Sequence, residues 1–159
     1  MDRPTASRGT ASPRAPSAVL VVDANILLSV LLGRRSRPLF DVVARSRTIV
    51  TSTHATDEVR GVLRGKPDLP GGILDRADAL LRGIGVIDKP VYADRMDDAA
   101  WVLTHAVASR NGSTTDAHLL ACAWVFDADI WSHDRDFAGS GWPSWSNANL
   151  SGAIAAGPG

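Results

Sequence analysis

Short aliphatic runs alternate with longer amphipathic segments along most of this chain. Residues 19–22 predict a short buried strand, because all four are aliphatic and three are β-branched. Apolar positions then continue at helical spacing up to Gly33, which predicts a helix over residues 24–32. Further strands are predicted near 48–51, 86–87, 130–132 and 143–146, and further helices from Ser36, over 53–64, 72–82 and 92–109, and from Thr114 or Thr115 to Phe126.

Strands that alternate with helices are typical of a parallel sheet covered on both faces. We therefore predict an α/β fold, a three-layer α/β/α sandwich with a mostly parallel sheet of four to five strands. Residues 1–17 are rich in Pro, Ser, Thr, Ala and Arg and are predicted to be a disordered extension. One domain is expected over residues 18–150, followed by a frayed C-terminus over 151–159.

Composition narrows the function classes only a little. The chain has 159 residues and a formal net charge of zero, so its overall charge neither favours nor excludes a nucleic-acid partner. A single cysteine, Cys122, excludes an internal disulfide and a cysteine-based zinc cluster. No apolar run approaches the roughly 18 residues that span a membrane, and no hydrophobic segment precedes Val19. We therefore expect a cytoplasmic protein.

The first candidate for chemistry is Asp23, which lies where the first strand ends and the first helix begins. Ligands bind at this edge of open parallel sheets, because strand ends and helix starts converge there. Asn25 follows two residues later and could position a water or a metal-bound ligand in the same crevice. Asp23 could equally be only a helix cap, and Asn25 could close an Asx turn.

The second candidate is Glu58, in the predicted helix over 53–64. His54, Glu58 and Val62 are spaced four residues apart, which places Glu58 at the margin of the core-facing stripe. Neighbouring Asp57 lies on the polar side of the same helix, so Glu58 is the preferred functional acid. The alternative is a solvated glutamate paired with an arginine one turn further on.

Asp116 is predicted in the first turn of its helix, where the helix dipole alone stabilises a carboxylate by about 0.3 to 1 kcal/mol. It shares a face with the apolar residues Leu119, Leu120 and Ala123. A carboxylate at a buried rim needs a partner, and a metal ion would supply one.

A further polar segment, 132–137, follows the fourth predicted strand directly. Asp134 and Asp136 are two residues apart and can reach one site from a tight turn, and Ser132 supplies a hydroxyl at the strand end. Turns are rich in aspartate, so this pattern alone indicates little.

Together, Asp23, Glu58, Asp116 and Asp134 come from four separate regions, each at a strand end or near a helix start. Like charges repel, so such a cluster is costly unless cations neutralise it. Oxygen-only ligands favour Mg²⁺ or Mn²⁺ over zinc. Two such ions about 3.5 to 4 Å apart can activate a water and stabilise the leaving oxygen in phosphodiester hydrolysis.

These motifs resemble those of the PIN-domain nucleases, which include the VapC-like toxins of bacterial toxin–antitoxin pairs. The matching segments, in chain order, are 22–25, 58–63, 116–121 and 132–137, and the resemblance covers the chain from about Val19 to Leu150. It implies that Asp23, Glu58, Asp116 and Asp134 are the catalytic, metal-holding residues, with Asp136 as an auxiliary acid and with Asn25 and Ser132 in supporting roles.

The resemblance also implies an activity and partners. A PIN-like nuclease domain is expected over residues 18–150, acting as an Mg²⁺- or Mn²⁺-dependent endoribonuclease on single-stranded or structured RNA. Members of the family are often homodimers and are often inhibited by a small antitoxin protein. This chain is accordingly interpreted as the toxin of a type II toxin–antitoxin pair or as a stand-alone nuclease.

Other interpretations stay open. A PIN fold can be retained as a non-catalytic binding module. A haloacid-dehalogenase-like phosphatase also places an aspartate after the first strand, but it needs an acid at the position of Asn25. Arg34, Arg35 and Arg37 follow the first helix and could form a phosphate-binding patch near the site or belong to a solvated loop. A zinc site is disfavoured because the spacings form no recognised pattern; its candidate ligands are His54, His105, His118, His133 and Cys122.

Overall fold

A five-stranded, fully parallel sheet forms the middle layer of the computed structural model, which describes residues 14–33, 35–106, 114–134, 137 and 139–157. The strand order is β3-β2-β1-β4-β5, so β1 lies at the centre of the sheet. The predicted α/β sandwich with a mostly parallel sheet of four to five strands is confirmed. The strands are β1 (Val19–Val22), β2 (Thr48–Ser52), β3 (Gly85–Ile87), β4 (Asp129–Trp131) and β5 (Ser144–Trp145).

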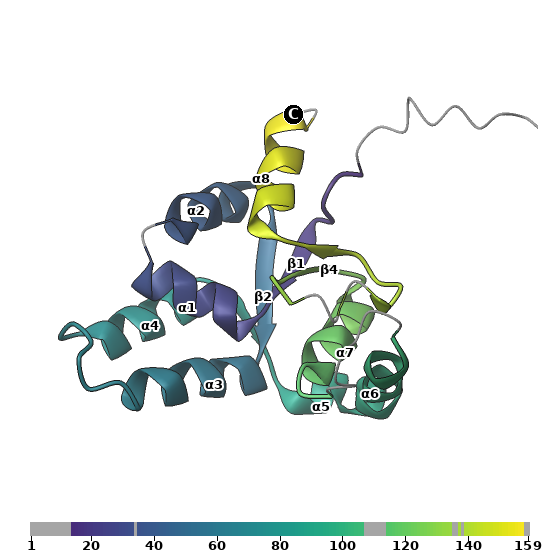
Figure 1. Ribbon diagram of the computed structural model, residues 1–159, viewed down its shortest axis with the longest axis horizontal. Helices are drawn as coiled ribbons and strands as arrows, with labels where there is room; N and C mark the ends of the chain where they lie inside the picture. The colour runs from purple at the N-terminus through teal and green to yellow at the C-terminus, as the bar shows by residue number, and fades with distance from the viewer. Residues whose placement is uncertain (1–13, 34, 107–113, 135–136, 138, 158–159) are drawn as a thin grey trace, which may run out of the picture.

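Helices cover both faces of the sheet, as Figure 1 shows. One face carries α1 (Ala24–Leu32), α2 (Ser36–Ser46), α3 (Thr53–Arg64) and α4 (Ile73–Arg82). The other carries α5 (Lys89–Tyr92), α6 (Met96–His105) and α7 (Ala117–Phe126), while α8 (Asn147–Ala156) packs beside α2. No helix in the described ranges is both long enough and apolar enough to cross a bilayer.

The centre of the core is formed by β1 and α7. Val21 pairs with Val50 of β2 on one side and with Ile130 of β4 on the other. Leu20, Val21 and Val22 are all 0% exposed, as expected for a central parallel strand that is covered on both faces. Seven consecutive residues of α7, 117–123, are buried as well. Asp23 and Ser132 directly follow these buried strands β1 and β4, at the carboxyl edge of the sheet.

Two predicted boundaries differ from the structure. The single helix predicted over 92–109 is instead α5, a 3-10 turn (Ala93–Arg95) and α6, which ends at His105; residues 107–113 lie outside the described part. Pro90 lies in the first turn of α5, where its fixed φ suits a helix start, and Tyr92 at the end of α5 is buried. The frayed end predicted from residue 151 is helical through Ala156, because Leu150 and Ile154 pack against the core.

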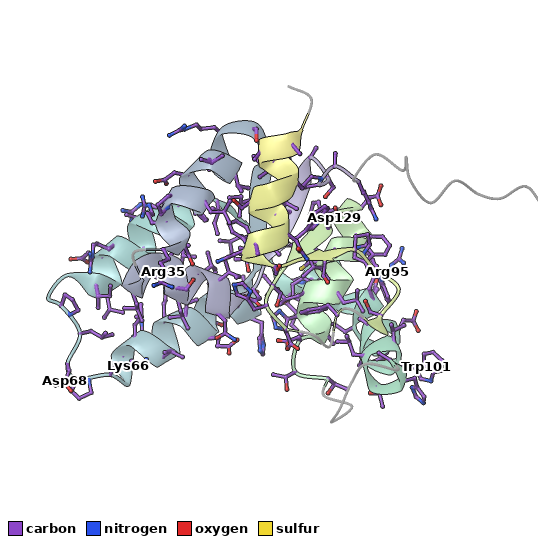
Figure 2. All side chains as sticks on the ribbon, turned by 45° about the horizontal axis from the view of Figure 1, so that its top comes forward. Arg35, Lys66, Asp68, Arg95, Trp101 and Asp129 are labelled. Carbon is purple, nitrogen blue, oxygen red and sulfur yellow. The ribbon has the colours of Figure 1, made fainter. Side chains whose placement is uncertain are left out.

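Asp129, at the start of β4, is a buried carboxylate to which the sequence analysis assigned no role. It is 2% exposed and accepts hydrogen bonds from Trp145 Nε1 at 2.8 Å, the Ser17 N–H at 3.1 Å and the Arg14 guanidinium at 3.2 Å. Its own N–H donates to Ser17 Oγ at 2.7 Å. Figure 2 labels Asp129 beside α8. Residues 14–17 of the predicted extension are thus attached to β4, whereas residues 1–13 lie outside the described part.

We expect Asp129→Ala to lower the free energy of unfolding by about 2 kcal/mol, because it leaves buried donors without an acceptor. Urea denaturation followed by circular dichroism measures this. Asp68→Ala, at an exposed position in the turn between α3 and α4, is the control and should change stability by less than about 0.5 kcal/mol. Equal unfolding midpoints for the two variants would contradict this account of Asp129.

Candidate active site

Asp23 is the most buried acid of the candidate site, and both of its carboxylate oxygens are engaged. Oδ1 accepts a hydrogen bond from the Ile26 N–H at 2.8 Å, so Asp23 is the N-cap of α1. Oδ2 accepts a hydrogen bond from the Ser132 hydroxyl. The side chain is fixed at the end of β1, where it is 6% exposed. Asp23 can therefore cap α1 and also belong to the candidate site, because Oδ1 makes the capping bond and Oδ2 faces Ser132.

Ser132 joins the ends of two neighbouring strands. It directly follows β4 and is 4% exposed. Its hydroxyl group donates a hydrogen bond to Asp23, which directly follows β1. The same oxygen accepts a hydrogen bond from the Asp134 N–H at 2.9 Å. The turn that carries Asp134 is thereby attached to the strand end that carries Asp23.

Asp116 brings the remaining acids into the same neighbourhood. It is the N-cap residue of α7 but makes no side-chain capping bond, and its carboxyl group instead hydrogen-bonds to that of Asp134. The negative charges of Asp134, Asp23 and Glu58 all raise the pKa of Asp116. Glu58 is exposed on α3, at the rim of this group. The structure thus brings together Asp23, Glu58, Asp116 and Asp134, while Asp136 lies outside the described residues.

Burial and repulsion set the protonation state of this cluster. Burial is the largest cause that raises the pKa of Asp116, to about 7, and the hydrogen bond with Asp134 is the next. That bond favours the protonated form because only a protonated Asp116 can donate to a second carboxylate. Burial also raises the pKa of Asp23, although the hydrogen bonds from Ser132 and Ile26 and the nearby charge of His133 lower it. Without a cation, the cluster retains a proton that isolated carboxyl groups would have lost.

The donor chemistry of the cluster fits a hard divalent cation. All its members offer carboxylate oxygens, the ligands that Mg²⁺ and Mn²⁺ prefer. Within the described ranges, no three His, Cys, Asp or Glu side chains stand close enough together to hold a metal as they are. Mutual repulsion between carboxylates opposes such closeness until a cation neutralises them. The thiol of Cys122 is 0% exposed, and burial raises its pKa to about 12, so it offers no thiolate for zinc.

The PIN domain family model matches residues 21–154 of the chain. This chain belongs to the PIN-domain family. The matched range begins within β1 and ends within α8, and it contains all four acids of the candidate site. No curated relative matches the chain.

Solved structures share the PIN fold with this chain at low sequence identity. A chain of VapBC2 from Rickettsia felis, bound to a promoter DNA fragment, is 13% identical with a TM-score of 0.63, over 80% of this chain and 98% of that chain. VapC20 from Mycobacterium tuberculosis, a toxin that cleaves the Sarcin–Ricin loop, is 20% identical with a TM-score of 0.57, over 77% and 95%. FitAcB from Neisseria gonorrhoeae is 16% identical with a TM-score of 0.55, over 82% and 99%. At identities this low, the structural similarity shows a shared fold and nothing further.

The two predicted supporting residues, Ser132 and Asn25, differ in their burial and in their contact with the acids. Ser132 contacts Asp23 as described, and Asn25 is exposed in the first turn of α1. Among the described arginines, Arg35 and Arg37 form no phosphate-binding patch at the site, because they follow the end of α1 and Asp23 precedes its start. A nine-residue helix is about 13 Å long, so these arginines lie well away from Asp23. Figure 2 shows Arg35 on the side of the molecule opposite Trp101. Arg34 lies outside the described residues.

Two residues beside the acids were not predicted to interact, Ser52 and His118. Ser52 Oγ lies 2.6 Å from His118 Nδ1, and the ring of His54 lies over that of His118 with centroids 4.2 Å apart. From the sequence, His54 and His118 were considered only as candidate zinc ligands, in a site that was disfavoured. The signal that could have found the contact is the position of His118 among apolar residues of α7, since a buried imidazole needs a partner.

The raised pKa of Asp116 predicts how stability depends on pH. The folded state holds a proton on Asp116 that the unfolded chain releases above the ordinary value of 3.8, so this group's contribution to stability is lost as the pH rises to about 7. In EDTA at about pH 8, Asp116→Asn should therefore melt about 2 to 4 °C above the wild type, the effect of about 1 kcal/mol in a domain of this size.

The gain should be smaller at about pH 5, where folded Asp116 keeps its proton and only the unfolded chain has released it. Asp57→Asn, at an exposed position on α3, is the matched control and should leave the melting temperature unchanged at both pH values. Scanning calorimetry measures all three proteins. A destabilised Asp116→Asn at the higher pH would show that the carboxylate is already compensated in the protein alone.

Proposed function

We propose that this PIN domain is a divalent-metal-dependent endoribonuclease that hydrolyses RNA phosphodiester bonds. The observation that supports this most strongly is the convergence of Asp23, Glu58, Asp116 and Asp134. Burial, the hydrogen bond with Asp134 and the charges of the other three acids raise the pKa of Asp116 to about 7. Strongly perturbed carboxylates at one sheet edge are typical of functional sites. None of the four acids that the PIN resemblance requires is missing from the chain.

Each residue has a distinct role in this proposal. Asp23 would be the fixed metal-holding carboxylate, because the Ile26 N–H and the Ser132 hydroxyl orient it. Asp116 would lose its proton on binding, Asp134 would offer a second carboxylate beside it, and Glu58 would add a carboxylate from the rim of the site. Mg²⁺ or Mn²⁺, when bound, supplies an activated water and neutralises charge on the leaving oxygen. Asp136 would be an auxiliary acid of the same site.

RNA is the proposed substrate, in single-stranded or structured form. VapC20, which shares this fold, cleaves the Sarcin–Ricin loop. The phosphodiester chemistry requires no serine or cysteine nucleophile, in agreement with the buried thiol of Cys122 and the hydrogen-bonded hydroxyl of Ser132. Haloacid-dehalogenase-like phosphatase activity gains no support, because an exposed amide, Asn25, stands where that mechanism needs an acid.

We further propose that the chain is the toxin of a type II toxin–antitoxin pair, that it forms a homodimer and that a small antitoxin inhibits it. Two-component complexes with this fold, VapBC2 and FitAB, have been solved on DNA fragments. A groove of about 920 Å³ between the end of α1, α2 and the segment before α4 offers apolar surface to a partner. Its lining also includes Arg45, Arg76 and an ion pair of Arg37 with Asp41 at 3.1 Å, and the net positive charge would favour an acidic partner segment.

RNA cleavage by the purified full chain tests the nuclease proposal directly. We expect cutting of structured or unstructured RNA with Mg²⁺ or Mn²⁺, no cutting in EDTA, and losses of at least about 100-fold in Asp23→Asn and Asp116→Asn. Asp57→Asn, which changes an exposed acid on the same helix as Glu58, should retain wild-type activity.

Metal-dependent cleavage that survives in both site variants would contradict the assigned site. A folded wild type that binds no metal and cuts no RNA would favour the non-catalytic binding module instead.

The partner proposal is tested with the gene next to the one that encodes this chain. We expect a small open reading frame there whose product co-purifies with the PIN domain and inhibits RNA cleavage at a stoichiometric ratio. Size-exclusion chromatography with light scattering reports the complex and the state of the free chain. An active nuclease with no such neighbour would be a stand-alone enzyme, contrary to the toxin proposal.

A further inference from the structure

The contact between Ser52 and His118 lies beside the candidate active site but has no part in the chemistry proposed above. Ser52 ends β2 and is the N-cap of α3, where its Oγ accepts a hydrogen bond from the Ala55 N–H at 3.0 Å. The same oxygen lies 2.6 Å from Nδ1 of His118 in the first turn of α7. Both residues are buried, at 0% and 3% exposed. One hydroxyl group thus joins the start of α3 to the start of α7.

The tautomer of His118 decides the direction of this hydrogen bond, because the Ser52 hydroxyl can donate as well as accept. A serine oxygen has two lone pairs, so its bond from the Ala55 N–H is compatible with either direction. In both tautomers of the neutral ring, one hydrogen joins Oγ of Ser52 to Nδ1 of His118, and Nε2 takes no part in this bond.

That second nitrogen makes the choice of histidine informative. Nε2 of His118 is buried and finds no hydrogen-bond partner within the described part of the chain. An unpartnered buried polar nitrogen is destabilising, so a residue needed only for packing would serve better as an aliphatic side chain. Histidine is therefore explained by its contacts with α3, which are the bond to Ser52 and the ring of His54 at 4.2 Å.

We propose that His118 is a positioning residue that sets the first turn of α7 against the first turn of α3. The first of these helices has Asp116 as its N-cap residue, and the second carries Glu58 one turn beyond His54. The charge of Glu58 already acts on Asp116, so the relative placement of the two helices decides how these carboxylates face a shared cation. This inference rests on the proposed function, since metal binding is what the positioning would serve.

His118→Leu and His118→Asn separate this role from packing. Leucine has a similar volume, removes the unpartnered nitrogen and cannot bond to Ser52, so the fold should keep or gain thermal stability. Asparagine places a polar atom of its amide near the position of Nδ1 and can still form a hydrogen bond with the Ser52 hydroxyl in either direction. By titration calorimetry of the full chain with Mn²⁺, we expect affinity to fall about 10-fold in His118→Leu and to stay within about 2-fold of wild type in His118→Asn.

Two more variants complete the design. His118→Gln carries its amide near the position of Nε2 and should behave like His118→Leu if the Nδ1 contact is what matters. His105→Leu changes an exposed histidine on α6 and should leave Mn²⁺ affinity unchanged. In RNA cleavage, the Mn²⁺ concentration for half-maximal rate should rise in step with the loss of affinity, while KM for RNA stays constant.

The outcomes are distinct. A wild type that binds no Mn²⁺ overturns the proposed function and this inference with it. A wild type that binds Mn²⁺ while His118→Leu binds equally well overturns the positioning role alone, as does rescue by His118→Gln without rescue by His118→Asn. If His118→Leu does not fold, Ser52→Ala and Ser52→Thr replace it: Mn²⁺ affinity should fall only when the hydroxyl is lost, and equal affinities would overturn the proposal.

Discussion

Repulsion among carboxylates at the carboxyl edge of the sheet is the constraint that organises this molecule. Asp23, Asp116 and Asp134 are drawn together from the ends of β1 and β4 and from the start of α7, and Glu58 adds its charge from α3. A protein does not gain stability from such an arrangement, as the raised pKa values of Asp23 and Asp116 indicate. The arrangement is explained if a divalent cation supplies the missing positive charge.

The fold holds these groups in place through its most rigid parts. Asp23 follows a strand that is fully buried between two parallel neighbours, and Asp116 precedes a helix whose first seven residues are buried. Polar contacts then connect these elements: Ser132 joins the ends of β1 and β4, and Ser52 with His118 joins the starts of α3 and α7. Far from the site, Asp129 binds Trp145 and residues 14–17 at the opposite edge of β4. Because buried strands and helices carry these carboxylates and hydrogen bonds connect the elements, the like charges are held near one another.

The sequence predicted those features whose signal is local. Strand periodicity ends at Asp23 after the aliphatic run of β1, and helix periodicity begins after Asp116. Each acid could therefore be placed at the boundary of an element from its neighbours in the sequence. Contacts between distant residues are not encoded in this way: nothing near Asp129 in the sequence points to Arg14, and nothing near Ser52 points to His118. The helix α8 was not predicted because its many small residues give a weak amphipathic pattern. Proximity in sequence also misleads for Arg35 and Arg37, because α1 separates them from Asp23 by its full length.

The protonation of Asp116 is the quantity that tests the central claim most directly. Its carboxyl carbon can be followed by nuclear magnetic resonance across a pH titration, with and without saturating Mg²⁺. The account predicts a pKa of about 7 in the metal-free protein, set by burial and by Asp134, and a pKa well below that value once the cation is bound. A metal-free pKa near the ordinary value of 3.8, or a titration that Mg²⁺ does not change, would contradict the account.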